Sequence, residues 1–210
     1  MNLNTALLIG MTINKNKMQT ILVVDNLSPF TSDIVTCLGK LGANYVAIKS
    51  NRLDLSDNDS GNNFSYDRVI LSGRRKNNRE INVVNSRIIR QCFKYNIPLL
   101  GICYGAEILA LTLGGTIRKM IRPVQDTISI TVSKSNSLLS VIRADKTLFV
   151  YESHRYCVAR LPEGFESLAS SLGCEHEVFS HKEKKMFGTQ FHPEKSGADG
   201  MNILSKFLNI

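Results

Sequence analysis

Short apolar runs, separated by segments with helical spacing, dominate the first half of the sequence. The runs are ILVVD (21–25), NYVAIK (44–49), DRVILS (67–72) and IPLLGI (97–102). Continuous apolar runs of this length are typical of strands that are covered on both faces of a parallel sheet. Because these strands alternate with helices, the pattern predicts an α/β fold with an open, mainly parallel central sheet flanked by helices.

The remaining pattern adds helices and a β-rich part. From about 116 to 191 the sequence changes to alternating segments such as TISITV and TLFVYES, which predicts additional strands. The polar segment 50–65 is expected to be a loop or a short ragged helix. Apolar spacing predicts helices over 31–42, 82–95, 106–113 and about 198–209.

A chain of 210 residues is long enough for one sizeable domain. Residues 1–17 have a weak pattern, so we interpret them as an N-terminal extension and 18–210 as the domain. No apolar run approaches the length that crosses a bilayer, and the first residues lack the features of a signal peptide. The 5 cysteines form neither a disulfide framework nor a metal knuckle, which indicates reduced thiols and a cytoplasmic protein.

The formal net charge is +8, from 26 basic and 18 acidic residues. Nucleic-acid binding is one interpretation of this excess. However, the basic residues are dispersed, and no recognition helix or aromatic-studded basic strand accompanies them. We therefore favour a surface that docks an acidic partner or an anionic substrate, and we expect neither nucleic acid nor a membrane as a partner.

Cys103 lies where a predicted strand meets a predicted helix, in PLLGICYGAEILA (98–110). Active sites of open α/β sheets lie at the carboxyl ends of the strands. Gly101 and Gly105 flank Cys103 at the spacing of a nucleophile elbow, where larger side chains would crowd a sharp turn. We expect Cys103 to be exposed on this turn, with the helix N-terminus favouring a thiolate nucleophile. The other cysteines are expected to be buried and unreactive, namely Cys37, Cys92, Cys157 and Cys174.

A cysteine nucleophile needs a base and a group that orients the base. His192, in GTQFHPEKSG, directly precedes Pro193, so its backbone should be extended. Glu194, two residues later, then projects to the same side. The sequence therefore predicts a site made of Cys103, His192 and Glu194.

The remaining histidines are candidates for metal ligands or for further site residues. His176 and His181 lie on opposite faces of a predicted strand, so they do not form a metal site with Cys174. His154 stands at the end of a predicted strand and is expected to line the same cleft as Cys103. No phosphate-cradling glycine-rich loop is present, so we predict neither a metal nor a nucleotide on this chain.

At these residues the chain resembles the class I glutamine amidotransferases, a family of Cys-His-Glu glutaminases with a flavodoxin-like sheet. LLGICYGAE is similar to their nucleophile elbow, TQFHPE to their His-Pro-Glu signature and ILVVDNLSPFT to their opening strand and turn. The resemblance runs from about Met18 to Ile210. It implies that Cys103 attacks the side-chain amide of glutamine to give a γ-glutamyl thioester. His192 would carry the protons, and Glu194 would hold the imidazole.

The resemblance also implies an oxyanion hole made by the backbone N–H of Tyr104 and by the turn that contains Gly73 and Arg74. The family usually has Ser-Gly-Gly-Pro in this turn, whereas this chain has Ser-Gly-Arg-Arg. Since arginine resists positive φ angles, we expect the turn to need a partner or substrate to take its working shape. Glu107 stands where the family commonly has a substrate-binding glutamine. A carboxylate cannot donate and would raise the pKa of Cys103, so we expect weak unassisted activity.

FVYESHRYCVARLPEGFESLASS resembles the glutaminase part of GMP synthetases, which places Ser153 and His154 beside the substrate glutamine. We therefore expect a separate glutaminase subunit that delivers ammonia to an ATP-pyrophosphatase subunit for the amination of XMP to GMP. The basic loop GRRKNNR (73–79) is the expected contact with that subunit. No cofactor is expected on this chain, since ATP and Mg²⁺ would bind the partner.

Three alternatives remain open. The opening turn of anthranilate or aminodeoxychorismate synthase glutaminases is matched as well, although Lys195 and the Tyr-Glu-Ser-His stretch fit that group less well. A non-catalytic regulatory subunit on the same fold would explain Glu107 and Arg74 as marks of decay. Another Cys-His hydrolase, such as a peptidase, is a weaker possibility. The turn matches are Asp25, Asn26, Phe30 and Thr31.

Overall fold

The computed structural model describes residues 19–53, 65–76, 78–139 and 145–210. The predicted extension 1–17 and most of the predicted loop 50–65 lie outside these residues. The start of that loop forms a short 3-10 helix, η1 (Ser50–Arg52).

One sheet of nine strands runs through the described residues, in the order β2-β1-β3-β4-β9-β8-β7-β5-β6. Strands β2, β1, β3, β4 and β9 pair in parallel, and the remaining strands continue the sheet with antiparallel pairs. The β-rich segment predicted after residue 116 therefore extends the central sheet and makes it mixed. The strands are β1 (Thr20–Asp25), β2 (Asn44–Lys49), β3 (Arg68–Leu71), β4 (Leu99–Ile102), β5 (Thr116–Val132), β6 (Thr147–Arg160), β7 (Phe165–Ser170), β8 (Val178–His181) and β9 (Met186–Thr189).

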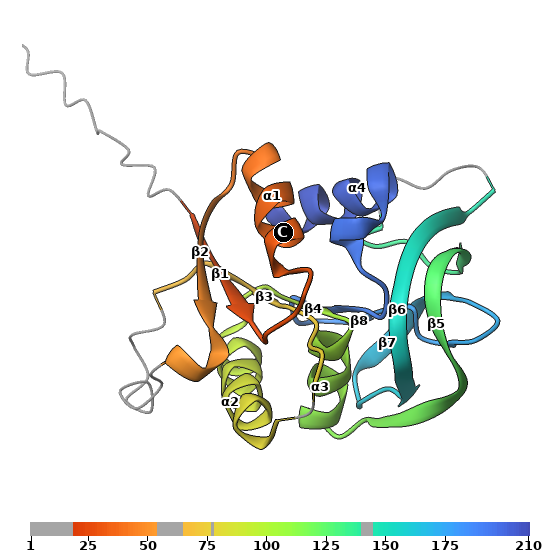
Figure 1. The fold of residues 1–210 in the computed structure, drawn as a ribbon, viewed down its shortest axis with the longest axis horizontal. Helices are drawn as coiled ribbons and strands as arrows, with labels where there is room; N and C mark the ends of the chain where they lie inside the picture. Colours follow the sequence, from red (N-terminus) through yellow and green to blue (C-terminus); the bar gives the residue numbers. More distant parts are fainter. Residues whose placement is uncertain (1–18, 54–64, 77, 140–144) are drawn as a thin grey trace, which may run out of the picture.

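Two pairs of helices cover opposite faces of the parallel strands. α1 and α4 lie on one face, and α2 and α3 lie on the other (Figure 1). Among the helices of the described ranges, none is long and apolar enough to cross a membrane. The helices are α1 (Thr31–Lys40), α2 (Arg79–Tyr95), α3 (Tyr104–Thr112) and α4 (Gly197–Leu208), with the 3-10 helix η3 (Pro193–Lys195) just before α4.

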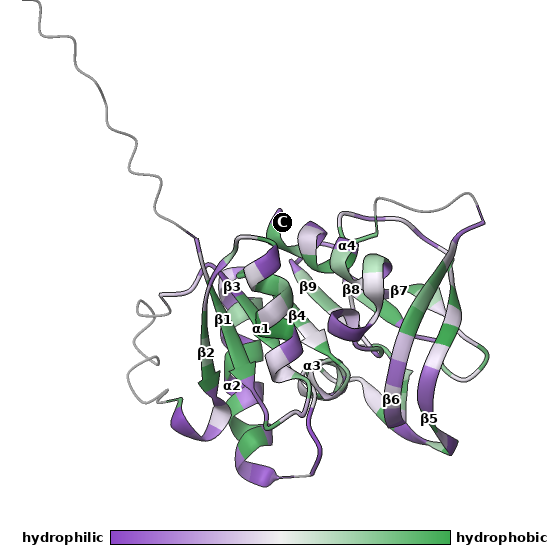
Figure 2. Cartoon of the chain, turned by 45° about the horizontal axis from the view of Figure 1, so that its top comes forward, coloured by the Kyte–Doolittle hydropathy of each residue, from purple (hydrophilic) through white to green (hydrophobic). Residues whose placement is uncertain are grey.

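Alternate side chains of the parallel strands fill two hydrophobic clusters. On β1, Ile21 and Val23 pack with α1 and α4, whereas Leu22 and Val24 pack with α2 and α3. Figure 2 shows β1, β3 and β4 as largely hydrophobic strands between the helices. Each fully buried aliphatic side chain contributes about 1.5–3 kcal/mol to folding. The apolar runs of β1, β3 and β4 thus also form the core, whereas β2, at the edge of the sheet, leaves most of its side chains exposed. The predicted α/β fold with a helix-flanked sheet is confirmed.

Two helices begin earlier than the sequence predicts. α2 starts at Arg79 because the side chain of Asn78 accepts hydrogen bonds from the N–H groups of Glu80 (2.7 Å) and Ile81 (3.2 Å). α3 starts at Tyr104, directly after Cys103, whereas the pattern predicted its start at residue 106. The second difference matters for the site, because Cys103 is the single residue between β4 and α3.

Candidate active site

Cys103 occupies a sharp turn with strained backbone geometry. Its φ of 53° and ψ of −107° lie outside the regions that non-glycine residues favour. Such a conformation costs about 1–3 kcal/mol and persists only where the surroundings enforce it. The flanking glycines make the turn possible. A methyl group at Gly101 would lie 2.4 Å from the carbonyl oxygen of Gly105, and one at Gly105 would lie 2.3 Å from that of Leu71.

The side chain of Cys103 is buried, so the predicted exposure is wrong. It is 6% exposed and packs in the cluster that also contains residues of α1 and α4. Burial raises the pKa of the Cys103 thiol well above its ordinary value, and the carboxylates of Glu107 and Glu152 raise this pKa further. A backbone hydrogen bond from Tyr104 lowers this pKa but does not outweigh burial. Burial thus opposes the thiolate that the helix N-terminus was expected to favour at this position.

His192 and Glu194 form a buried pair just after β9. Nδ1 of His192 lies 2.7 Å from Oε1 of Glu194. His192 has the extended backbone predicted for a residue before proline, with φ −101° and ψ 95°. Because a carboxylate accepts the hydrogen bond, we assign the proton of the neutral ring to Nδ1, which leaves Nε2 as the basic nitrogen.

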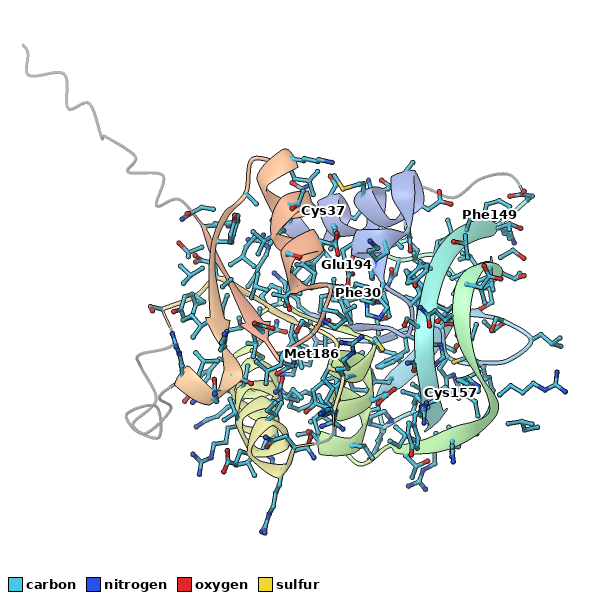
Figure 3. All side chains as sticks on the ribbon, viewed as in Figure 1. Phe30, Cys37, Phe149, Cys157, Met186 and Glu194 are labelled. Carbon is cyan, nitrogen blue, oxygen red and sulfur yellow. The ribbon has the colours of Figure 1, made fainter. Side chains whose placement is uncertain are left out.

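Contacts from several elements hold this pair in place. The N–H of His192 donates to the carbonyl oxygen of Tyr151 on β6 at 2.9 Å. The Phe30 ring meets the imidazole edge to face, with centroids 4.8 Å apart. The thiol of Cys37 on α1 donates to the carbonyl oxygen of Glu194 at 3.8 Å. Figure 3 labels Phe30, Cys37 and Glu194 near α1, where these contacts meet.

Gly73, in the turn after β3, shows that the predicted residues converge. A methyl group built on Gly73 would lie 3.1 Å from Cε1 of His192 and 3.8 Å from Cβ of Cys103. Both side chains therefore border the same small space, although they are far apart in the sequence. On its other side, the Cys103 thiol points to the carbonyl oxygen of Ser153 at 3.9 Å. The fold thus gathers a thiol, an imidazole–carboxylate pair and a glycine turn.

Arg74 does not adopt a positive φ angle, so the strain expected for an arginine in this turn does not arise. Its guanidinium carbon lies 3.8 Å from the centroid of the Tyr104 ring, at the start of α3. Its Nη1 donates to Oδ1 of Asn82 at 2.6 Å, and the Tyr104 hydroxyl donates to the same oxygen at 2.8 Å. The turn is thus held against α2 and α3 by this chain's own residues, and the expectation that a partner or substrate brings it into its working shape stays a prediction. No sequence pattern pointed to Asn82.

Glu107 lies one helical turn after Cys103 and is buried. Its Oε1 accepts a hydrogen bond from Nε2 of Gln190 at 3.3 Å. Burial raises the pKa of Glu107, and the hydrogen bond from Gln190 lowers this pKa. As expected from the sequence, the Glu107 charge in turn raises the pKa of Cys103.

Of the two predicted residues Ser153 and His154, Ser153 contacts the Cys103 thiol, whereas the polar contacts of the His154 ring are with Tyr156 and Glu152. Ser153 borders the thiol through its carbonyl oxygen. The His154 ring instead binds Glu152, with Nε2 2.5 Å from Oε2, and lines a neighbouring pocket with Glu152 and Glu177. Sequence reasoning missed both of these glutamates. Within the described residues, no group of three or more metal-binding side chains is placed to hold a metal ion.

The site thus combines a buried thiol on a strand-to-helix turn with a His-Glu pair that follows the neighbouring strand β9. This arrangement is typical of cysteine-dependent enzymes on α/β sheets. Residues 22–210 match the family model described as glutamine amidotransferase class-I, so the chain belongs to the class I glutamine amidotransferases. The resemblance inferred from the sequence motifs is therefore confirmed.

Particular relatives fit this assignment. The chain is 31% identical to one subunit of the glutamine-hydrolyzing GMP synthase of Thermoplasma acidophilum, over 92% of this chain and 93% of that protein. It is 38% identical to the glutamine-hydrolyzing GMP synthase of Acetivibrio thermocellus, over 57% of this chain and 23% of that protein. The chain thus spans nearly all of the first relative but less than a quarter of the second, longer one.

Solved structures give the same result. The crystal structure of a protein described as a GMP synthase subunit from Thermoplasma acidophilum matches with a TM-score of 0.78 and 28% identity, covering 91% of this chain and 93% of that one. A glutamine amidotransferase from Thermotoga maritima matches with a TM-score of 0.69 at 20% identity, covering 89% of this chain and 80% of that one, which supports the fold alone.

Proposed function

We propose that the chain is a glutaminase in which Cys103 is the nucleophile, His192 the base and Glu194 the group that orients the base. The observation that carries this proposal is the approach of Cys103 and His192 to Gly73, with Glu194 bound to the far nitrogen of the ring. This geometry supports the proposal, because the three roles need their side chains within one small space.

The proposed reaction begins when the amide carbon of glutamine approaches the thiol. His192 takes the thiol proton as the sulfur attacks, and the carbonyl oxygen becomes an oxyanion. Collapse of this intermediate breaks the C–N bond, with His192 returning the proton to the leaving ammonia. Water, activated by the same imidazole, then hydrolyses the γ-glutamyl thioester to glutamate. The strongly raised pKa of Cys103 supports deprotonation coupled to attack rather than a preformed thiolate.

The backbone N–H of Tyr104 is the first donor that we propose for the oxyanion. It belongs to the first turn of α3, where N–H groups have no partner within the helix, and it points to the Cys103 sulfur. The turn after β3 provides the second N–H, from Arg74 or Gly73, since Gly73 lies beside both reacting side chains. A single donor of this kind contributes about 3–4 kcal/mol to stabilising the transition state.

We further propose that the ammonia serves a separate ATP-pyrophosphatase subunit that aminates XMP to GMP. The similarity to the Thermoplasma acidophilum GMP synthase subunit over nearly both full lengths supports this acceptor. ATP and Mg²⁺ would bind the ATP-pyrophosphatase subunit, and the exposed Arg75, Lys76 and Arg79 provide a basic surface for docking. The five buried free thiols support a reducing, cytoplasmic setting.

The turn shared with anthranilate-type glutaminases does not favour that acceptor. Oδ1 of Asp25 accepts hydrogen bonds from the N–H of Leu27 (2.9 Å) and the hydroxyl of Thr31 (2.8 Å), which closes the turn before α1. Phe30 packs on His192. These residues shape the glutaminase side of the molecule, so their presence does not identify the acceptor of ammonia.

The test is release of glutamate from glutamine, measured with the chain alone and with an ATP-pyrophosphatase subunit, ATP and XMP. We expect release that requires Cys103 and increases with the complete mixture. A Cys103→Ser variant that folds normally but releases glutamate at the wild-type rate would overturn the proposed chemistry. Release that proceeds without any dependence on XMP or the partner would leave the glutaminase but overturn the proposed acceptor.

A further inference from the structure

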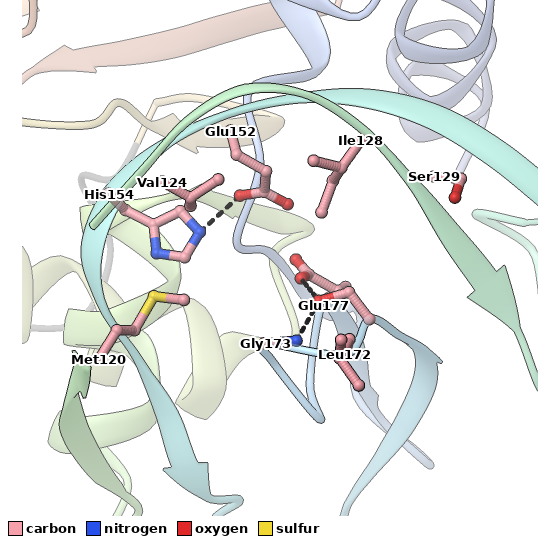
Figure 4. Close-up of a pocket in the computed structure, with 10 residues that line it drawn as sticks. Met120, Val124, Ile128, Ser129, Glu152, His154, Leu172, Gly173 and Glu177 are labelled. Carbon is pink, nitrogen blue, oxygen red and sulfur yellow. Dashed lines mark hydrogen bonds and ion pairs between the residues drawn. The ribbon is translucent and has the colours of Figure 1, made fainter. Parts of the chain in front are cut away.

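A second chamber lies beside the proposed catalytic centre and has no role in the mechanism above. It has a volume of about 280 Å³ and an opening to solvent. Its walls come from β5, β6 and the segment between β7 and β8, and Figure 4 shows its side chains. The apolar part of the wall is formed by Met120, Val124, Ile128 and Leu172, and the charged part by Glu152 and Glu177.

The two carboxyl groups are deeply buried and incompletely bonded. The relative exposure is 0% for Glu152 and 1% for Glu177. When both are ionised, no donor within the described part of the chain reaches Oε1 of Glu152 or Oε2 of Glu177. The other oxygen of Glu177 accepts a hydrogen bond from the Ser171 hydroxyl at 2.6 Å. A buried carboxylate oxygen without a donor is unfavourable unless a proton or a bound molecule supplies one.

The neighbouring His154 does not supply the missing hydrogen-bond donors. The Nδ1–H of His154 donates to the carbonyl oxygen of Tyr156 at 2.7 Å, so Nε2 is the nitrogen that faces Glu152. One proton between Nε2 and Oε2 satisfies that contact but leaves Oε1 of Glu152 open.

The pKa values of the two carboxyls are raised, as expected for buried groups that lack hydrogen-bond donors. Burial raises the pKa of Glu152 to about 7, although a hydrogen bond with Glu177 lowers this pKa in part. Burial and the charge of Glu152 raise the pKa of Glu177 to about 8. The two groups therefore compete for protons, and the chamber favours a guest that brings both positive charge and N–H donors.

The shape of the chamber narrows the choice of guest. The described residues provide no three-ligand cluster for a metal ion. A chamber of about 280 Å³ is also much larger than a bare ammonium ion needs, and most of its wall is apolar. A guest with an aliphatic part would contact Met120, Ile128 and Leu172 while its cationic end reaches the carboxyls. Leu172 is fully exposed at present, so covering it would also remove apolar surface from water.

We propose that this chamber binds a primary ammonium group on a short aliphatic stem, with Glu152 and Glu177 accepting its N–H bonds. The inference goes beyond glutamine hydrolysis and does not depend on it. Two sources share this chemistry, namely a simple alkylamine and the amino end of an aliphatic amino acid. The chamber is adjacent to the proposed nucleophile. Glu152 and His154 line the chamber, and Ser153 between them contacts the Cys103 thiol through its carbonyl oxygen.

The test measures binding to the wild-type chain in the absence of glutamine, by calorimetry and by the shift in melting temperature. The probes are n-butylammonium, ammonium, tetramethylammonium and L-norvaline, all as chloride or zwitterion at constant ionic strength. We expect n-butylammonium to bind at least about tenfold more tightly than tetramethylammonium, which lacks N–H donors, since one hydrogen bond to a charged group corresponds to that factor. If L-norvaline competes with n-butylammonium for the chamber, the natural ligand is the amino end of an amino acid. If n-butylammonium binds and L-norvaline does not, the natural ligand is an alkylamine.

Substitutions of the two carboxyls test whether n-butylammonium binds in this chamber. Glu152→Gln and Glu177→Gln, made singly and together, should each weaken n-butylammonium binding by about tenfold or more. Glu175→Gln is the matched control, because Glu175 is an exposed carboxylate in the same segment. The single variants keep the test decisive if the double variant does not fold. Equal binding of tetramethylammonium, equal binding of bare ammonium, or binding that is unchanged in folded Glu152→Gln and Glu177→Gln would overturn the proposal.

Discussion

Nδ1 of His192 lies 2.7 Å from Oε1 of Glu194, and both side chains are almost completely buried. This contact fixes the orientation of the ring and, through the acceptor character of the carboxylate, the nitrogen that carries its proton. The other edge of the ring approaches Gly73 and, through it, Cys103. In the proposed mechanism, this contact with Glu194 is what orients His192 to act as the base.

The first prediction concerns Glu194→Gln. A glutamine of the same shape can donate to Nδ1, which would move the ring proton to Nε2 and remove the base. We expect kcat for glutaminase activity to fall by about 10³–10⁴, with little change in KM, by analogy with orienting carboxylates in other triads. Glu175→Gln, an exposed change elsewhere on the chain, should keep wild-type kinetics. Wild-type kcat in a folded Glu194→Gln protein would contradict the orienting role.

The second prediction concerns Gly73→Ala. The added methyl would lie 3.1 Å from Cε1 of His192, which is closer than ordinary contact. We expect the ring to be displaced by a few tenths of an ångström and kcat to fall, but by less than about 10²-fold, the loss expected for a misplacement of roughly 1 Å. Gly39→Ala is the matched control, because a methyl there meets nothing within 4 Å and lies in α1. It should preserve activity and stabilise the fold by about 0.5–1 kcal/mol, as measured by steady-state kinetics and thermal unfolding.

The sequence was sufficient to predict the sheet and to nominate the residues of the candidate site, but it did not reveal the environment of those residues. Apolar runs such as ILVVD specify buried strands directly, because their composition is the cause of their burial. The sequence could not show that Cys103 is buried, since that depends on α1 and α4 closing over the turn. Similarly, the sequence offers only the φ preference of arginine at position 74, whereas the stacking of Arg74 on Tyr104 is a tertiary contact.

The glutamates of the second chamber were missed for a related reason. Glu152 lies in an alternating strand, where a charged residue is ordinarily expected to face solvent. Only the pairing of β6 with β5, and the segment between β7 and β8 that covers it, places Glu152 beside Glu177. Contacts between residues far apart in sequence leave no local pattern, so they could be found only in the structure.

The third prediction concerns the thiol of Cys103. Because the carboxylate of Glu107 contributes to raising the pKa of Cys103, Glu107→Gln should lower that pKa. At a fixed pH below the pKa, the thiolate fraction then rises, and alkylation of Cys103 by iodoacetamide should be several-fold faster. The measurement is the pH dependence of the alkylation rate, with the modified residue located by peptide mass spectrometry. An alkylation profile for Glu107→Gln that coincides with the wild-type profile would show that the Glu107 charge does not reach the thiol.

The fourth prediction concerns the pH dependence of stability. The pKa values of Glu152 and Glu177 are raised in the folded chain to about 7 and about 8, above the ordinary value of 4.5. The folded state thus binds these protons more tightly than the unfolded state does. Their contribution to stability is complete below about pH 4.5 and is lost as the pH rises through 7 to 8.

Glu152→Gln and Glu177→Gln should therefore flatten the decline of the melting temperature between about pH 5 and pH 9, because a neutral amide has no proton to lose. Relative to wild type, each variant should gain stability as the pH rises through this range. Thermal unfolding followed by circular dichroism at closely spaced pH values measures this difference. Glu175→Gln serves again as the control and should follow the wild-type curve. A difference between variant and wild type that stays constant across the whole range would mean that these carboxyls titrate normally, and the buried, proton-sharing pair in the second chamber would have to be abandoned.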